Sequence, residues 1–171
     1  WLGRPAASRS VLVRPSLDVG PADELNAGGI YGPSIPTPGG SRTAFSWTPD
    51  GRALIFVGRR GGVQQIFVRR LDAPEARALA NTEGAQAPAV SADGQWVAFW
   101  AKRTIWKVPL AGGPPMELLT GIQFPPRGLV WDASGRLYFS KEPDGLIWQI
   151  PPAGGAPSAA RPVWSSPSSW P

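Results

Sequence analysis

Residues 88–101, PAVSADGQWVAFWA, decide the fold because their pattern recurs at a fixed interval along the chain. Residues 44–58, AFSWTPDGRALIFVG, and residues 128–140, GLVWDASGRLYFS, also place two apolar runs around a turn that contains glycine. The turn glycines, Gly51, Gly94 and Gly135, lie 43 and 41 residues apart. A period of about forty residues predicts a repeat protein in which each unit is one supersecondary structure.

Two further landmarks keep the same period. The strings QQIFVRR at 64–70, TIWKVPL at 104–110 and LIWQIPP at 146–152 follow the three turn glycines in order. The strings AGGPP at 111–115 and AGGAP at 153–157 are 42 residues apart. Because three independent markers share one spacing, the sequence predicts three copies of one structural unit.

Each unit predicts four short β-strands. In the second unit the expected strands span 87–91, 95–101, 104–110 and 116–120. Side chains within 104–110 alternate between two sides, with Ile105, Lys107 and Pro109 on one and Trp106, Val108 and Leu110 on the other. Alternation bounded by Gly, Pro, Asp and Ser is typical of strands. We expect Gly51 and Gly94 at positive φ in their turns, where a side chain would clash.

A four-stranded meander of this length cannot bury both of its faces alone, and stacking such sheets around an axis does so. We therefore predict an all-β fold, a partial β-propeller of about three four-stranded antiparallel blades in an open arc. The expected organisation is a linker with a lone N-terminal strand near 11–13 (1–42), blade 1 (43–86), blade 2 (87–127), blade 3 (128–162) and the truncated start of a further blade (163–171).

The layers between the blades are expected to contain the bulky residues Phe56, Phe67, Phe99, Trp106, Phe139 and Trp148. Three blades cannot close a ring, since propellers have about four to eight, so we expect the chain to be truncated. The outer faces of the first and last blades would then lack their expected partners, the missing propeller blades of the parent chain. We expect Phe56 and Phe67 at one end, and Phe139 and Trp148 at the other, to be partly exposed. Such a chain should associate or be only marginally stable.

Composition excludes several kinds of chemistry. The chain has no cysteine and no histidine, which removes those nucleophiles, the imidazole base and every usual zinc ligand except carboxylates. The net charge is +5, and its densest groups are Arg59-Arg60 and Arg69-Arg70. Because both pairs are expected at strand ends, we interpret them as solvated charges and predict no nucleic-acid partner.

The acidic residues are interpreted as structural. Asp50, Asp93 and Asp144 each precede a glycine, a position that favours turn formation through side-chain hydrogen bonds over calcium binding. The stretch WDASGRLYF is similar to sugar-lactone hydrolases, which are metal-containing propellers, but Asp132 is expected in a turn and Glu142 in a hairpin loop. The sequence therefore predicts no catalytic residue, no cofactor and no metal site.

The chain resembles a known repeat type. TEGAQAPAVSADGQWVAFWA (82–101), AGGPPMELLTG (111–121) and PRGLVWDASGRLYF (126–139) resemble the TolB-like, or WD-like, propeller repeats of bacteria. The similarity is greatest to the propeller region of Acidobacteria-type receptor serine/threonine protein kinases, whose lead-in stretch is similar to VRPSLDVGP (13–21). The chain itself has no glycine-rich phosphate loop, no His-Arg-Asp and no Asp-Phe-Gly.

This resemblance implies a non-catalytic sensor or protein-interaction module, held outside the cytoplasm by a membrane-anchored parent kinase. Its partner, a protein or a small ligand, is not specified by the residues. Two alternatives stay open. The chain could be the propeller of a prolyl-oligopeptidase-type peptidase, or a TolB-like periplasmic scaffold. Flanking kinase and membrane segments, a downstream Gly-x-Ser-x-Gly hydrolase, or a signal peptide with neither would discriminate among the three.

Overall fold

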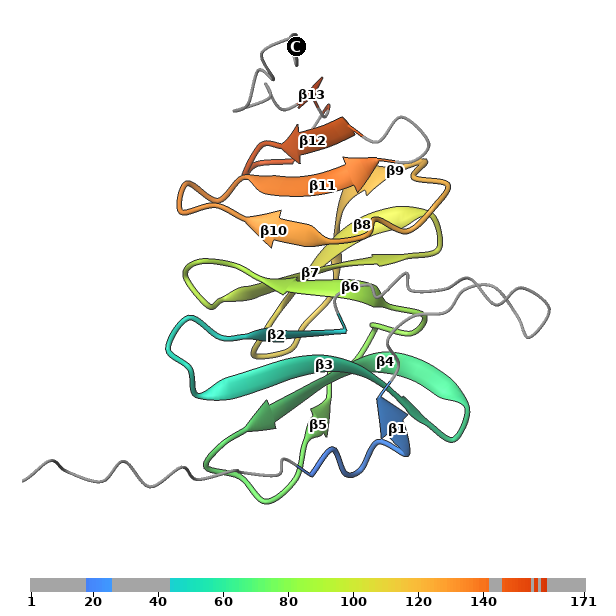
Figure 1. Cartoon of the computed structure of the whole chain (residues 1–171), viewed down its shortest axis with the longest axis vertical. Helices are drawn as coiled ribbons and strands as arrows, with labels where there is room; N and C mark the ends of the chain where they lie inside the picture. The colour runs from blue at the N-terminus through green and yellow to red at the C-terminus, as the bar shows by residue number, and fades with distance from the viewer. Residues whose placement is uncertain (1–17, 26–43, 142–145, 155, 157, 160–171) are drawn as a thin grey trace, which may run out of the picture.

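The structure, a computed structural model, describes residues 18–25, 44–141, 146–154, 156 and 158–159. Every regular element in these ranges is a β-strand, and the strands form three antiparallel sheets. Figure 1 shows the sheets one above another along the long axis, each forming one blade. The predicted all-β partial propeller is therefore confirmed. No helix in the described ranges is long and apolar enough to cross a membrane.

Each blade is a meander of four strands. Blade 1 contains β2 (Phe45–Trp47), β3 (Ala53–Arg60), β4 (Val63–Arg70) and β5 (Arg77–Ala78). Blade 2 contains β6 (Gln86–Val90), β7 (Trp96–Ala101), β8 (Thr104–Pro109) and β9 (Met116–Thr120). Blade 3 contains β10 (Leu129–Trp131), β11 (Leu137–Lys141), β12 (Leu146–Ile150) and β13 (Ser158–Ala159).

The turn that joins the first two strands is one residue shorter in blade 3. The residues paired across this turn are Trp47 with Leu54, Val90 with Val97, and Trp131 with Leu137. In a strand, a shift of one residue moves every side chain to the opposite face of the sheet. If the three units are aligned on their turn glycines, the side chains of β11 are therefore assigned to the wrong face. The pairing instead makes Phe56, Phe99 and Phe139 equivalent. Phe99 and Phe139 face the preceding blade, and Phe56 lies on the corresponding face of blade 1. We call this face of each blade the N-side face and the opposite one the C-side face.

Two apolar layers hold the blades together. The first joins the C-side face of blade 1 to the N-side face of blade 2, and contains Ile55, Val57, Ile66, Val68, Leu79, Val97, Phe99 and Val108. The second joins blades 2 and 3, and contains Ala98, Trp100, Ile105, Leu129, Leu137, Phe139 and Ile150. The expectation that Phe99, Trp106, Phe139 and Trp148 contribute to the layers between blades is confirmed.

The same expectation is wrong for Phe56 and Phe67. Their rings stack 5.5 Å apart on the N-side face of blade 1, away from blade 2. They are nevertheless 0% exposed, because Ala22 and Val19 pack over them. Phe139 is also buried, at 2% exposed, because it faces blade 2 and not the end of the arc. The predicted exposure of these three rings is therefore wrong.

The covering segment, residues 18–25, was expected to be linker. It contains β1 (Glu24–Leu25), which pairs with β3 beyond the end of β2. The Asp23 amide donates to the Arg59 carbonyl at 2.7 Å, and the Ala76 amide donates to the Gly20 carbonyl at 2.8 Å. The segment thus crosses blade 1 from β5 to β3. The strand expected near 11–13 lies outside the described residues.

Candidate functional site

The candidate site lies at the end of the stack where the β2–β3, β6–β7 and β10–β11 turns meet, on the left in Figure 1. We call it the turn end. A first groove of about 400 Å³ lies there between blades 1 and 2, and a second of about 270 Å³ between blades 2 and 3. Equivalent turns line both grooves because the repeat places the same elements beside each interface.

The turn carboxylates are held by nearby donors. The Thr48 hydroxyl donates to Asp50 Oδ1 at 2.6 Å, and the Arg52 amide donates to the same oxygen at 3.0 Å. In blade 2 the Ser91 hydroxyl and the Gln95 amide donate to Asp93 Oδ1 at 2.5 and 2.9 Å. These bonds are the turn-forming role predicted for both aspartates.

Blade 3 forms an equivalent hydrogen-bonded turn, but its aspartate and its hydroxyl residue occupy each other's positions. Asp132 takes the place of the hydroxyl residue, and the Ser134 hydroxyl donates to its Oδ1 at 2.7 Å. The Arg136 amide donates to Oδ1 at 3.0 Å, while the Tyr138 hydroxyl donates to Oδ2 at 3.2 Å. The predicted turn role of Asp132 is confirmed; Glu142 and Asp144 lie outside the described residues.

These donors favour the ionised carboxylates. The Thr48 hydroxyl lowers the pKa of Asp50, the Ser91 hydroxyl lowers the pKa of Asp93, and the Ser134 hydroxyl lowers the pKa of Asp132. All three side chains therefore stay charged at neutral pH. None has the raised pKa that a general acid needs.

Arginine side chains border the first groove. Arg70 forms an exposed ion pair with Asp72, with its Nη2 2.6 Å from Oδ2, which raises the pKa of the guanidinium. Arg77 donates from Nη2 to the Leu110 carbonyl at 2.9 Å and so connects blade 1 to blade 2. Arg69 lies on the N-side face of blade 1, outside the groove lining, where it is half-buried and donates to backbone carbonyls. Arg69 therefore differs from the solvated strand-end charge that was predicted.

The other predicted arginine pair, Arg59 and Arg60, lies near the β3–β4 hairpin at the opposite end of the stack. Both residues are exposed, as expected for strand-end charges. Arg59 Nε lies 3.7 Å from the Glu24 carboxylate. An exposed pair of this kind contributes little to stability.

Aromatic residues distinguish the second groove. Trp96 and Trp131 both line it, and Lys107 Nζ lies 4.7 Å from the centroid of the Trp96 ring, a cation–π contact. The Trp131 indole donates to the Ala89 carbonyl at 3.1 Å. Sequence reasoning assigned Trp106 and Trp148 to the layers between blades and did not single out Trp96 or Trp131. The alternating pattern did place Lys107 on the same side of its strand as Ile105 and Pro109, and the strand pairing shows that this side is the C-side face, where Trp96 also lies.

Within the described ranges, no three His, Cys, Asp or Glu side chains are grouped so that they could hold a metal ion. The grooves instead offer a mixed surface of carboxylates, guanidinium groups, hydroxyls and tryptophan rings. This mixture is suited to reversible binding of polar partners.

No family model matches the chain, and no curated protein matches it. Solved structures do match. A candidate TolB from Agrobacterium tumefaciens shares 16% identity with a TM-score of 0.65, over 84% of this chain and 48% of its own. The fold is that of a TolB-like β-propeller. TolB from Acinetobacter baumannii (18% identity, TM-score 0.54) aligns with 68% of this chain and 31% of its own.

Virginiamycin B lyase from Staphylococcus aureus has the same architecture, at 16% identity and a TM-score of 0.52, over 74% of this chain and 43% of its own. This chain spans less than half the length of each of these three structures. At such identities the likeness extends to the fold alone, since one propeller fold serves unrelated functions.

Proposed function

We propose that this chain is a non-catalytic sensor or protein-interaction module, the extracytoplasmic propeller of a bacterial receptor serine/threonine kinase. The observation that carries the non-catalytic part is the state of the carboxylates in the turns at the turn end. Each of Asp50, Asp93 and Asp132 accepts hydrogen bonds within its own turn and has a lowered pKa. These groups stabilise loops and are poorly suited to proton transfer.

The binding part of the proposal rests on the second groove. Trp96 and Lys107 are only partly buried, and their cation–π contact holds the ammonium group at the groove lining. Tryptophan and basic side chains together are typical of protein-binding surfaces. The kinase context rests on the resemblance of residues 82–101, 111–121 and 126–139 to receptor-kinase propellers.

A TolB-like periplasmic scaffold is the second candidate, and the structural likeness to two TolB proteins favours it. The reading frame on the chromosome separates the two candidates. Kinase motifs and a membrane segment upstream would support the receptor. A signal peptide without a kinase would support the scaffold, and a downstream Gly-x-Ser-x-Gly hydrolase would contradict both.

Turnover assays test the absence of catalysis. The purified chain is incubated with chromogenic esters, lactones and glycosides, with Asp132→Asn as the matched variant. We expect no turnover above that of buffer for either protein. Turnover by the native chain that is lost in Asp132→Asn would show that this carboxylate does chemistry, and the proposal would fail.

A binding assay tests the groove. The native chain, Trp96→Ala and Lys107→Ala are each immobilised and exposed to an extracytoplasmic extract of the source bacterium. Lys102→Ala, an exposed lysine in the β7–β8 hairpin, is the control. We expect bound protein to decrease for the two groove variants and not for the control. Equal capture by all four proteins would contradict a binding role for the groove.

A further inference from the structure

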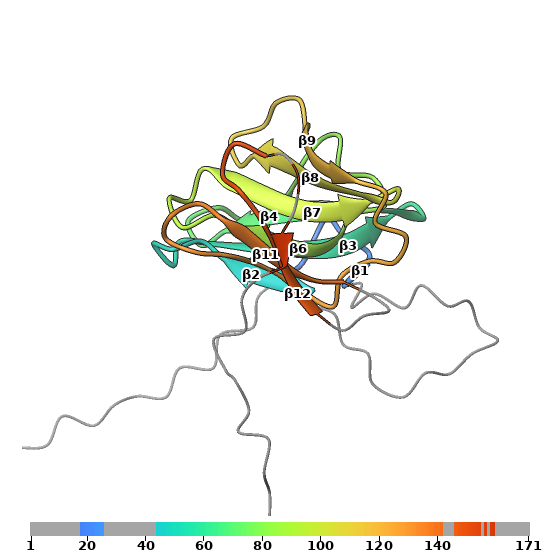
Figure 2. The ribbon, with the colours of Figure 1, turned by 90° about the horizontal axis from the view of Figure 1, so that it is seen from above.

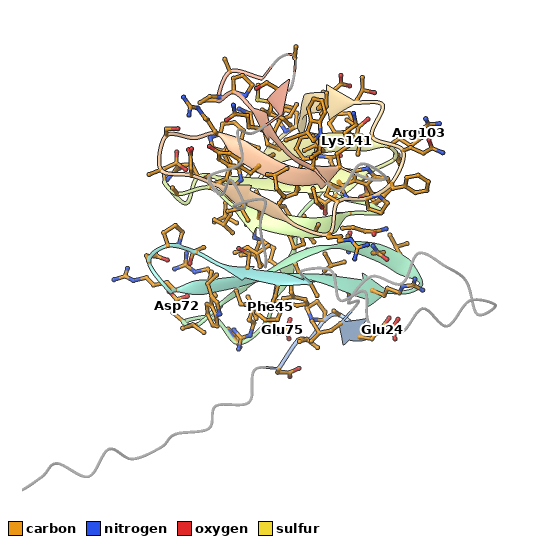
Figure 3. All side chains as sticks on the ribbon, turned by 45° about the horizontal axis from the view of Figure 1, so that its top comes forward. Glu24, Phe45, Asp72, Glu75, Arg103 and Lys141 are labelled. Carbon is orange, nitrogen blue, oxygen red and sulfur yellow. The ribbon has the colours of Figure 1, made fainter. Side chains whose placement is uncertain are left out.

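The two outer faces of the arc carry exposed apolar residues. On the N-side face of blade 1, Phe45 is 55% exposed and Trp47 is 45% exposed. Figure 3 shows Phe45 on the first blade, away from the other two. On the C-side face of blade 3, Val130 is 64% exposed and Ile147 is 50% exposed. These are the two surfaces at which a neighbouring blade would pack.

The equivalent positions in blades 1 and 2 show what would cover the exposed residues of blade 3. Ile66 and Ile105 occupy in blades 1 and 2 the position of Ile147, and both are 0% exposed. Ala89 occupies in β6 the position of Val130 in β10, and it is 5% exposed. A following blade buries each of these positions, so the C-side face of blade 3 is an unoccupied blade-binding surface in the described part of the chain.

A hydrogen bond between blades 2 and 3 provides the template for the missing contact. The Trp131 indole on β10 donates to the Ala89 carbonyl on β6 at 3.1 Å. Trp47 occupies in β2 the same position as Trp131, since each pairs with the first leucine of the following strand, Leu54 and Leu137. Within the described residues the Trp47 indole has no hydrogen-bond partner.

From this equivalence we propose that the partner is a second copy of the chain, docked head to tail. The N-side face of blade 1 in one copy packs on the C-side face of blade 3 in the other. Trp47 of one copy donates to the Val130 carbonyl of the other, as Trp131 does to Ala89. Two such contacts, related by a two-fold axis, close a ring of about six blades, within the four to eight that propellers have.

The segment 18–25 is compatible with this contact. It covers Phe56 and Phe67 on the outer part of blade 1 and leaves β2 exposed. Within the chain, neighbouring blades meet through their innermost strands, β2 with β6 and β6 with β10, and also through side chains of the middle strands. Figure 2 shows β2 on the opposite side of the stack from β9. The proposed interface therefore uses β2 as the blades within the chain use their innermost strands, and the segment 18–25 takes the place of the contact between middle strands.

Charge does not oppose the contact. On the C-side face of blade 3 the side chains of the paired strands are Val130, Tyr138, Ser140, Ile147 and Gln149, and all are uncharged. The β2 side chains opposite them would be Phe45 and Trp47. The segment 18–25 beside β2 carries Asp18, Asp23 and Glu24, whose carboxylates already accept from the Gly20 amide, accept from the Gly61 amide and lie 3.7 Å from Arg59 Nε, respectively. The contact at β2 itself therefore avoids the cost of burying an unpaired ion.

Light scattering after size exclusion tests the assembly on the whole chain. We expect a concentration-dependent species of twice the 18.1 kDa chain mass. Trp47→Ala should raise the dissociation constant roughly tenfold or more, as loss of a buried aromatic anchor does, without changing the circular dichroism. Met116→Ala, which removes an exposed apolar residue on β9, should not change the dissociation constant. A monomer at every concentration, or open-ended polymers, would overturn the proposal.

Crosslinking tests the head-to-tail geometry. The chain has no cysteine, so Phe45→Cys and Val130→Cys each introduce a unique thiol. Treated with a short bismaleimide, a mixture of the two variants should give covalent dimers, and each variant alone should give few. A mixture of Val63→Cys, exposed on β4, with Val130→Cys is the control and should not crosslink. Equal crosslinking in the control mixture, or crosslinking of single variants only, would overturn the head-to-tail contact.

Discussion

Gly58 allows residues 18–25 to approach blade 1, and Gly58→Ala should displace them. A Cβ atom at this buried position would lie 2.9 Å from the Ala22 Cβ, 3.1 Å from the Glu24 carbonyl oxygen and 3.2 Å from Phe56 Cε2. Carbon atoms pack best at about 3.5–4.0 Å, so the first contact alone forces movement. The equivalent residue of blade 2 is Ala101, which faces no such segment.

The expected cost follows from two opposing effects. Inserting a methyl group into a filled site costs about 1–3 kcal/mol. Replacing glycine within a strand returns about 0.5–1 kcal/mol of conformational entropy. The difference between these ranges is about 0–2.5 kcal/mol. Because the added Cβ would lie only 2.9 Å from the Ala22 Cβ, we expect Gly58→Ala to lower the free energy of unfolding by about 1–2.5 kcal/mol, measured by urea denaturation.

Hydrogen exchange locates the effect. The amides of Asp23 and Ala76 donate to the Arg59 and Gly20 carbonyls, so their protection should decrease when the segment moves. Ala22→Gly removes the closest atom, and the double variant with Gly58→Ala should recover part of the loss. Unchanged stability and unchanged protection in Gly58→Ala would refute the view that close packing of this segment requires glycine.

Four further outcomes are expected. Gly94, at φ +71°, should lose about 1 kcal/mol on substitution by alanine, as seen in denaturant unfolding. Phe99→Ala, at the layer between blades 1 and 2, should cost about 3–5 kcal/mol in the same assay, and a smaller loss would contradict its core role. Asp72→Ala breaks an exposed ion pair and should change stability by less than about 0.5 kcal/mol. The pKa of Asp93 is lowered in the folded chain. Its contribution to the free energy of unfolding is therefore fully present above the pKa of the unfolded chain and is lost as the pH falls through the pKa of the folded chain. In an acid titration, Asp93→Asn should lose less stability below about pH 4 than the native chain does.

The sequence alone was sufficient to predict the repeat and the positions of its strands. The strands of blade 2 match the expected ranges within one residue, because alternation and turn residues are local signals. Positive φ at Gly51 and Gly94 also followed from the turn type and is confirmed. At the candidate site, the turn roles of Asp50 and Asp93 were predictable for the same reason. The second groove was not, because the tryptophans that line it cannot be told from core tryptophans by their spacing.

Tertiary structure alone decided which face each strand presents and what covers it. Period-two alternation sorts the side chains of a strand into two faces but does not say which face meets the next blade. In blade 3 the turn is one residue shorter, so an alignment of the units on their turn glycines assigns the side chains of β11 to the wrong face. β1 has two residues and no periodicity, and its position depends on pairing with Gly58 and Arg59, more than thirty residues away. The burial of Phe56 and Phe67 therefore depends on a long-range contact, which local sequence patterns do not encode.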